Sequence, residues 1–214
     1  MSKYVVIDLE MCNVPKSKQK LCGCKNEIIE IGAVLIDDSL EITDNFKTFV
    51  SPEYGILDSY ISRLTGIKAQ NLKGAPVFSV ALDMLLKWIP EGAVVVTWSD
   101  SDEKQIRTEA KRKGISCPSL ETLFNGTVDC QAAFSEEINS PKIFRLSDAL
   151  NIACVDYDER LHEAYADAYN TALLFIKMKK ESPLKLSSYY LQKFSKITHY
   201  NPFSELLDEF GCAV

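Results

Sequence analysis

The 214-residue sequence contains no long hydrophobic run, and its longest apolar stretches are residues 93–96 and 172–176. A transmembrane helix needs about 20 consecutive apolar residues, so the sequence predicts no membrane span. The N-terminal residues lead directly into a strand-like segment, with no apolar signal region before it. We therefore expect a cytoplasmic globular protein with no membrane association.

The sequence also lacks an excess of basic residues. It has 24 Lys and Arg against 30 Asp and Glu, a net charge of −6. Proteins that coat nucleic acid through charge alone carry a basic surface, so the balance disfavours that class. An enzyme that holds a polyanion through metal ions stays compatible with it.

A regular cysteine framework is missing too. The seven cysteines are an odd set at irregular spacings, so we expect free thiols rather than disulfides. Cys22 and Cys24, with Cys12 upstream, form the one close group. No further Cys or His pair nearby completes the four ligands of a structural zinc site, which disfavours such a site.

The pattern of apolar residues predicts strands first and helices later. Strands are expected at residues 4–10, 27–37, 41–50, 93–97 and 127–130, with an exposed loop at 11–26. Helices are expected at residues 56–64, 77–88, 101–113, 146–153 and 163–180. This order predicts an α/β sandwich with a mixed sheet, whose first three strands form an antiparallel meander.

The last 32 residues, 183–214, hold six of the 19 Tyr and Phe residues. Such aromatic density indicates a segment that packs on something. We expect a domain over residues 1–182 and an aromatic-rich extension over 183–214. The extension would pack on its own domain or, alternatively, on a protein partner or a second copy of the chain.

Asp8 and Glu10 lie two residues apart at the end of the first expected strand. Side chains at i and i+2 share one face of a strand, so the two carboxylates point together while Ile7 and Leu9 point away. Neighbouring acids at a buried strand end repel each other unless cations neutralise them, and oxygen ligands suit Mg²⁺ or Mn²⁺. Two solvated acids at a strand edge are the alternative.

Asp102 follows the expected strand 93–97 at the start of the next helix. Ligands bind at the carboxyl ends of strands in open α/β sheets. Asp100 is expected to cap this helix or fill its first turn, and a capping box with Ser99 is the alternative role for Asp102. We favour Asp102 as the functional acid because Ile106, four residues later, packs the helix on the sheet and leaves Asp102 at the positive helix end.

His162 and Asp167 would lie about 140° apart on one straight helix, because five residues turn about 500°. They converge only if His162 precedes the helix on a loop, which the polar run at 156–160 allows. A structural histidine is the alternative.

Together these segments offer four carboxylates and one imidazole at strand or helix ends. Two divalent cations would offset the four charges, and a two-metal site implies in-line displacement at phosphorus. An imidazole, which ordinarily titrates near pH ~6.5, can take the proton of an attacking water. The products would be a phosphomonoester and a new hydroxyl end.

The same residues resemble the motifs of the DnaQ-like, DEDD superfamily of 3′→5′ exonucleases. Asp8 and Glu10 match the first motif, Asp102 the second, and residues 162–168 the third, His-x-Ala-x-x-Asp-Ala. The histidine indicates the DEDDh branch, because Glu163 stands where the other branch carries tyrosine. The resemblance implies a ribonuclease H-like three-layer sandwich with a mixed five-stranded sheet flanked by helices.

Within the superfamily the sequence is most similar to the Eri-type RNA exonucleases and their bacterial relatives, on residues 26–34, 46–53 and 61–67. The resemblance implies a terminal-nucleotide pocket lined by Met11, Cys12, Leu64, Thr65, Gly66 and Ile67. It also implies two Mg²⁺ (or Mn²⁺) ions, the catalytic one held by Asp8, Glu10 and Asp167 and the second held by Asp8 and Asp102.

The activity implied is 3′→5′ hydrolysis of single-stranded RNA ends to nucleoside 5′-monophosphates, with His162 as general base. The expected partner is single-stranded nucleic acid, RNA favoured. One alternative is a DNA exonuclease of the same mechanism. A non-catalytic nucleic-acid-binding or partner-binding member is the other alternative, and five intact site residues argue against it.

Overall fold

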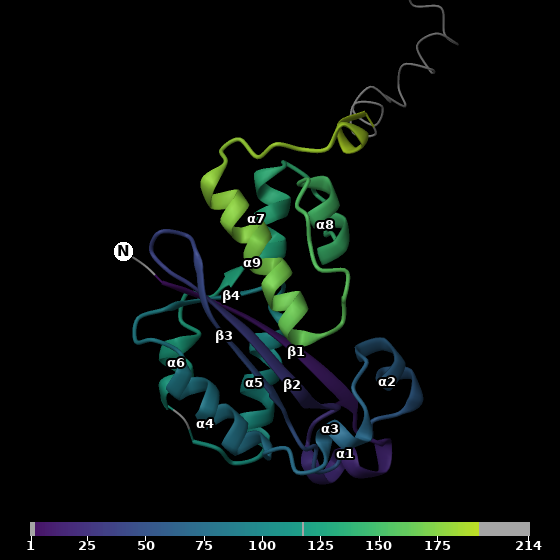
Figure 1. The fold of residues 1–214 in the computed structure, drawn as a ribbon. Helices are drawn as coiled ribbons and strands as arrows, with labels where there is room; N and C mark the ends of the chain where they lie inside the picture. Colours follow the sequence, from purple (N-terminus) through teal and green to yellow (C-terminus); the bar gives the residue numbers. More distant parts are fainter. Residues whose placement is uncertain (1–2, 117, 193–214) are drawn as a thin grey trace, which may run out of the picture.

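The computed structural model describes residues 3–116 and 118–192. Its centre is a five-stranded sheet of order β3-β2-β1-β4-β5 (Figure 1). The strands are β1 (Tyr4–Asn13), β2 (Asn26–Ile36), β3 (Ile42–Phe49), β4 (Val94–Thr97) and β5 (Val128–Asp129). The first three pair antiparallel, and β4 and β5 continue the sheet in parallel from β1. The mixed sheet with an antiparallel meander is as the sequence predicts.

Helices flank this sheet on both faces. They are α1 (Lys16–Cys22), α2 (Ser59–Thr65), α3 (Ala69–Leu72), α4 (Phe78–Trp88), α5 (Ser101–Arg112), α6 (Pro118–Leu123), α7 (Cys130–Glu137), α8 (Leu146–Ile152) and α9 (Ala164–Lys180). Within the described residues, none of them is both long and apolar enough to cross a membrane.

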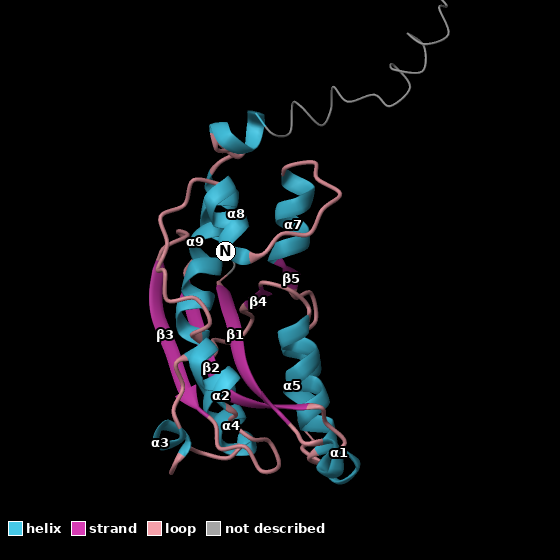
Figure 2. Ribbon diagram, turned by 90° about the vertical axis from the view of Figure 1, so that its right-hand side faces the viewer, coloured by secondary structure: helices cyan, strands magenta, loops and turns pink. Residues whose placement is uncertain are grey.

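The alternation of side chains along β1 divides the core into two layers. Val5, Ile7 and Leu9 pack with residues of α4, α5 and α6, whereas Val6 packs with residues of α7 and α9. Figure 2 shows α5 and α9 on opposite sides of β1. A third cluster, around Cys12 and Ile29, packs at α2 and α3. The first part of β1 therefore packs under α9, and its last part packs under α2.

Residues 11–26 differ from the expected exposed loop. β1 runs on to Asn13, α1 follows, and Val14, Cys22 and Cys24 are buried together. The expectation was wrong because the lysines of this segment indicated exposure, while its small apolar residues pack inward. The short helices α3, α6 and α7 were also missed, and in α7 the buried residues are only Cys130 and Phe134.

The extension expected from residue 183 begins by packing on the domain. Leu184 is buried in a cluster with residues of α7, α8 and α9. The ring of Tyr190 lies edge-on to that of Phe144, with centroids 6.2 Å apart. Residues 193–214 lie outside the described residues, so the domain boundary and a dimer through this extension stay predictions.

The cysteines of the described residues, Cys12, Cys22, Cys24, Cys130 and Cys154, are free thiols. Cys154 is exposed and the other four are buried. The thiol of Cys22 donates to the carbonyl oxygen of Cys24, 3.3 Å away, which gives this pair a packing role.

Candidate active site

Asp8 and Glu10 lie on the α9 side of β1, directly opposite Gly32 and Glu30 of β2. Pairing across an antiparallel sheet places such partners on one face. The register shifts immediately after Glu10, a β-bulge of the kind found beside active sites. The two carboxylates therefore project together at the point along β1 where the helix packed on the strand changes from α9 to α2.

Gly32 lets α9 approach the sheet at backbone distance. A Cβ atom at this position would stand 2.3 Å from the carbonyl carbon of Ala164 and from the nitrogen of Tyr165. Any side chain here would push the first turn of α9 away. Because Gly32 pairs with Asp8, this contact seats the start of α9 beside the first motif.

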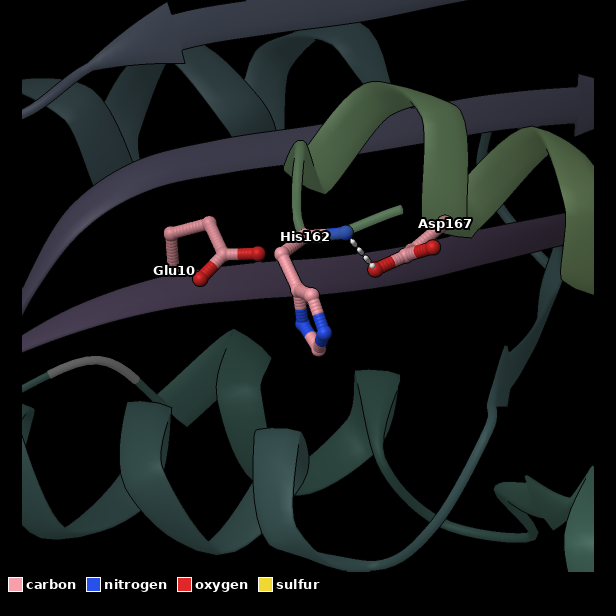
Figure 3. A group of neighbouring side chains, drawn as sticks. All are labelled: Glu10, His162 and Asp167. Atoms are coloured by element: carbon pink, nitrogen blue, oxygen red, sulfur yellow. Dashed lines mark hydrogen bonds between the residues drawn. The ribbon is translucent and has the colours of Figure 1, made fainter. Parts of the chain in front are cut away.

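His162 precedes α9 on a loop, the arrangement that convergence with Asp167 requires. Its φ of 67° lies in the left-handed region, and its backbone N–H donates to Asp167 Oδ2 over 2.9 Å (Figure 3). One ligand atom each of Glu10, His162 and Asp167 lies within 4.8 Å of the other two. The first and third motifs therefore meet.

Asp102 joins them from the first turn of α5. It is buried, and its carboxylate accepts a hydrogen bond from the backbone N–H of Leu9 on β1. Asp100 occupies the N-cap position, but its side chain makes no capping hydrogen bond and pairs with Lys104 instead. Asp100 therefore holds the expected cap position but contributes no side-chain capping bond.

Crowding raises the pKa of all four acids, and burial is the largest cause for each. For Asp8, repulsion from Asp102 and Asp167 adds to burial. Burial and repulsion from Asp167 raise the pKa of Glu10 to about 8. Burial raises the pKa of Asp102 to about 7 against the hydrogen bond from Leu9. The pKa of Asp167 is also raised by burial, against the bond from His162.

These four carboxylates have no basic ion-pair partner among the described residues. Asp167 Oδ1 is buried without a hydrogen-bond donor from the described part of the chain. An oxygen-only donor set with excess negative charge matches the preference of Mg²⁺ and Mn²⁺. The residues present therefore fit a divalent-cation site.

An ion network that the sequence does not predict lies beside this cluster. Lys47 Nζ lies 3.1 Å from Glu30 Oε1 and 2.5 Å from Glu163 Oε1. Glu30 is fully buried, and its other oxygen accepts the N–H of Ala164 at the start of α9. The network therefore ties Glu163 and Ala164, which directly follow His162, to β2 and β3. The signal that the sequence offered was Glu30, an acid within the apolar run 26–34.

A cavity of about 790 Å³ opens above the acids. Its lining residues are Asp8, Tyr60, Leu64, Trp98, Gln131, Ile143, Phe144, Arg145, Leu146, Ser147, Leu161, His162 and Asp167. Its walls come from α2 on one side and from the segments before α8 and α9 on another. It is large enough for a nucleotide-sized ligand.

Of the residues expected to line a nucleotide pocket, Leu64 lines this cavity and the others do not. The side chains of Cys12, Thr65 and Ile67 are buried, and Met11 packs against the main core. The α2 segment still forms one wall, through Leu64 and Tyr60. A role of the other five residues in nucleotide binding stays a prediction.

Comparisons with known proteins agree with this geometry. The profile of the exonuclease family RNase_T matches residues 5–175. The PolC-type DNA polymerase III of Caldanaerobacter subterraneus is 30% identical over 176 residues, which cover 82% of this chain and 11% of that protein. Human ERI1 exoribonuclease 2 is 34% identical over 179 residues, covering 71% and 25%. The chain thus spans about a tenth and a quarter of these relatives.

Among solved structures, the nuclease domain of 3′hExo, a DEDDh family member bound to rAMP, superposes with a TM-score of 0.69 at 22% identity. The match covers 87% of this chain and 96% of that one. The likeness confirms the ribonuclease H-like three-layer fold.

Proposed function

The chain belongs to the exonuclease family RNase_T, with the 3′→5′ exonuclease chemistry of DEDDh enzymes, and from that premise we propose that it is a metal-dependent exoribonuclease. It would remove nucleoside 5′-monophosphates from the 3′ ends of single-stranded RNA. The observation that carries the proposal is the convergence of four acids and His162, of which Asp8, Asp167 and His162 line one cavity. We favour RNA over DNA as the substrate because the human relative is named an exoribonuclease.

In this proposal Asp8, Glu10 and Asp167 hold one divalent cation, and Asp8 and Asp102 hold a second. Bound cations would offset the charge of the carboxylates and stabilise the charge that develops on the phosphate oxygens. Two observations support this assignment: the four acids have no basic ion-pair partner among the described residues, and burial and mutual repulsion raise the pKa values of Asp8 and Glu10.

His162 is exposed at the cavity and would accept the proton of the attacking water, then release it to solvent. Asp167 accepts the 2.9 Å hydrogen bond from the backbone N–H of His162, and this bond holds the proposed base at a defined distance from the acid cluster. Leu64 and Tyr60 of α2 would bound the space for the terminal nucleotide.

A digest of a 5′-labelled single-stranded RNA 12-mer tests the proposal. With Mg²⁺ or Mn²⁺ we expect a ladder that shortens one nucleotide at a time from the 3′ end, and nucleoside 5′-monophosphates as product. Excess chelator should stop it. Internal cuts, 3′-monophosphate products or full activity in chelator would refute the mechanism.

DNA is the second candidate substrate, because the PolC-type relative belongs to a DNA polymerase. A DNA 12-mer of the same sequence decides between them. We expect the RNA to be shortened about tenfold faster or more, since a site that contacts the 2′-hydroxyl distinguishes the two. Equal or faster digestion of DNA would favour the second candidate.

A further inference from the structure

The cavity extends past the acid cluster to residues 143–147, at the start of α8. Ile143, Phe144, Arg145, Leu146 and Ser147 all line it. This wall is separate from the α2 wall and from the motifs that define the exonuclease family. The proposed chemistry assigns no role to this wall.

Arg145 is the one Arg or Lys among the described residues that line this cavity. Its side chain is exposed, and it forms no ion pair or side-chain hydrogen bond with the described part of the chain. Arg107 and Arg160 differ, because each is paired with carboxylates. A guanidinium left without a partner in a cavity that admits a polyanion is suited to bind a phosphate.

The position of Arg145 separates it from the bond to be cleaved. It shares the cavity with Asp8 and Asp167 but makes no ion pair with either. The scissile phosphate must lie at the carboxylates that hold the cations. Arg145 therefore lies beyond ion-pair distance of these acids but within the same cavity, where a neighbouring phosphate of the strand could reach it.

We propose that Arg145 binds the 5′-phosphate of the penultimate nucleotide, one phosphate upstream of the scissile bond. The ligand class is a phosphodiester or terminal phosphate on a strand of at least two nucleotides. The subsite rests on the proposed function and deepens it, because it makes the enzyme recognise a strand rather than an isolated nucleotide. Ile143 and Tyr60, exposed by 77% and 63%, offer apolar surface for the bases.

Two dinucleotides that differ by one phosphate test this subsite. ApA carries only the scissile phosphate, whereas pApA also carries the 5′-phosphate that Arg145 would bind. We would measure kcat/KM for both with Mg²⁺, in the full-length wild type and in Arg145→Met. Lys142→Met is the matched control, because Lys142 is exposed three residues before Arg145 on the same segment and does not line the cavity.

We expect the wild type to prefer pApA by about tenfold, the size of one charge-assisted contact. Arg145→Met should lose that preference and keep its rate on ApA within about twofold. Lys142→Met should keep the preference, which excludes a general effect of charge. Arg145→Lys should retain part of it.

Three results would overturn the subsite: no preference in the wild type, a preference that survives in Arg145→Met, or an equal loss on both substrates in that variant. The 12-mer digest distinguishes a failure of the subsite from a failure of the proposed function. If the wild type shortens the 12-mer while the dinucleotides give one of these results, only the subsite is rejected. If the 12-mer is not shortened, the proposed function fails.

Discussion

Two groups of carboxylates, each with buried members, stand at different places in the molecule, and only one of them contains its own cation. In the structural group, Lys113 Nζ lies 2.8, 2.6 and 3.3 Å from oxygens of Glu27, Glu53 and Glu109. In the active-site group, no described basic side chain pairs with any of the four acids. A group that holds the fold thus supplies its counter-charge, whereas one that performs chemistry leaves it to a ligand.

The pKa values of Glu27 and Glu10 follow this difference. Although burial opposes it, hydrogen bonds from Lys113, Tyr54 and Gly55 lower the pKa of Glu27. Burial and repulsion raise the pKa of Glu10 to about 8. At Glu109, in the same group as Glu27, burial outweighs the hydrogen bonds and raises the pKa. The direction therefore depends on the balance between burial and the donors around each carboxylate.

The largest effect is expected from removing an acid of the active-site group. Asp8→Ala should lower kcat on the RNA 12-mer by about a thousandfold, because several kcal/mol of transition-state stabilisation depend on the cations. The melting temperature in chelator should stay equal or rise, since one repelling charge is gone. Asp83→Ala, on the surface of α4, is the control. Undiminished activity in Asp8→Ala would show that the site is misassigned.

Removing the cation of the structural group should act on stability instead. Lys113→Met leaves two buried carboxylates unpaired, and we expect the free energy of unfolding to fall by about 3–5 kcal/mol. Urea unfolding measures this. Lys104→Met, which breaks only the exposed pair with Asp100, should cost less than about 1 kcal/mol. Similar losses in both variants would remove the distinction between the two groups.

The active-site group should also make stability depend on pH and on metal. The folded protein keeps protons on Glu10 and Asp102, whose pKa values are about 8 and about 7, that the unfolded chain releases near pH ~4. The unfolded state therefore binds fewer protons between these limits, and stability falls as the pH rises through them.

In chelator we expect the melting temperature to fall by roughly 5 °C or more between pH 5 and about pH 8, and Mg²⁺ to reduce that fall. Thermal melts across this range measure it. Asp102→Asn removes one of the titrating acids, so its melting temperature should change less with pH. A wild-type melting temperature that rises over the range would contradict the raised pKa values.

The smallest effect concerns Lys47, the cation closest to the active-site group. It pairs with Glu30 and Glu163 and holds the end of the loop that bears His162. Lys47→Met should lower kcat about tenfold with KM within about twofold, as a positioning residue would. Lys180→Met, which loses a surface pair with Glu41, is the control. A change confined to KM would place Lys47 in substrate binding.

Local patterns in the sequence predict much of the active-site group. The i, i+2 spacing of Asp8 and Glu10 predicts their shared face, and the helix start after a buried strand marks Asp102. The angle between His162 and Asp167 requires the loop that the structure contains. Each of these signals depends on backbone geometry within a few residues, which a sequence carries directly.

Partners that are distant in sequence could not be predicted in this way. Lys47 meets Glu163 across 116 positions, and nothing local distinguishes Lys47 from an exposed lysine. Cys12 fits the alternation of β1, but its side chain is buried under α2 and α3 rather than facing the cavity. Arg145 has no motif at all, and it becomes a candidate only because the fold places it on the cavity wall.

The backbone contact at Gly32 bears on how the enzyme meets its substrate. At Gly32 no side chain separates the start of α9 from β2, so this end of the helix has no room to move toward the strand. The first turn of α9, which bears Asp167, is thus seated against the strand partner of Asp8 before any ligand binds. Any residue larger than glycine at position 32 would push these two acids apart.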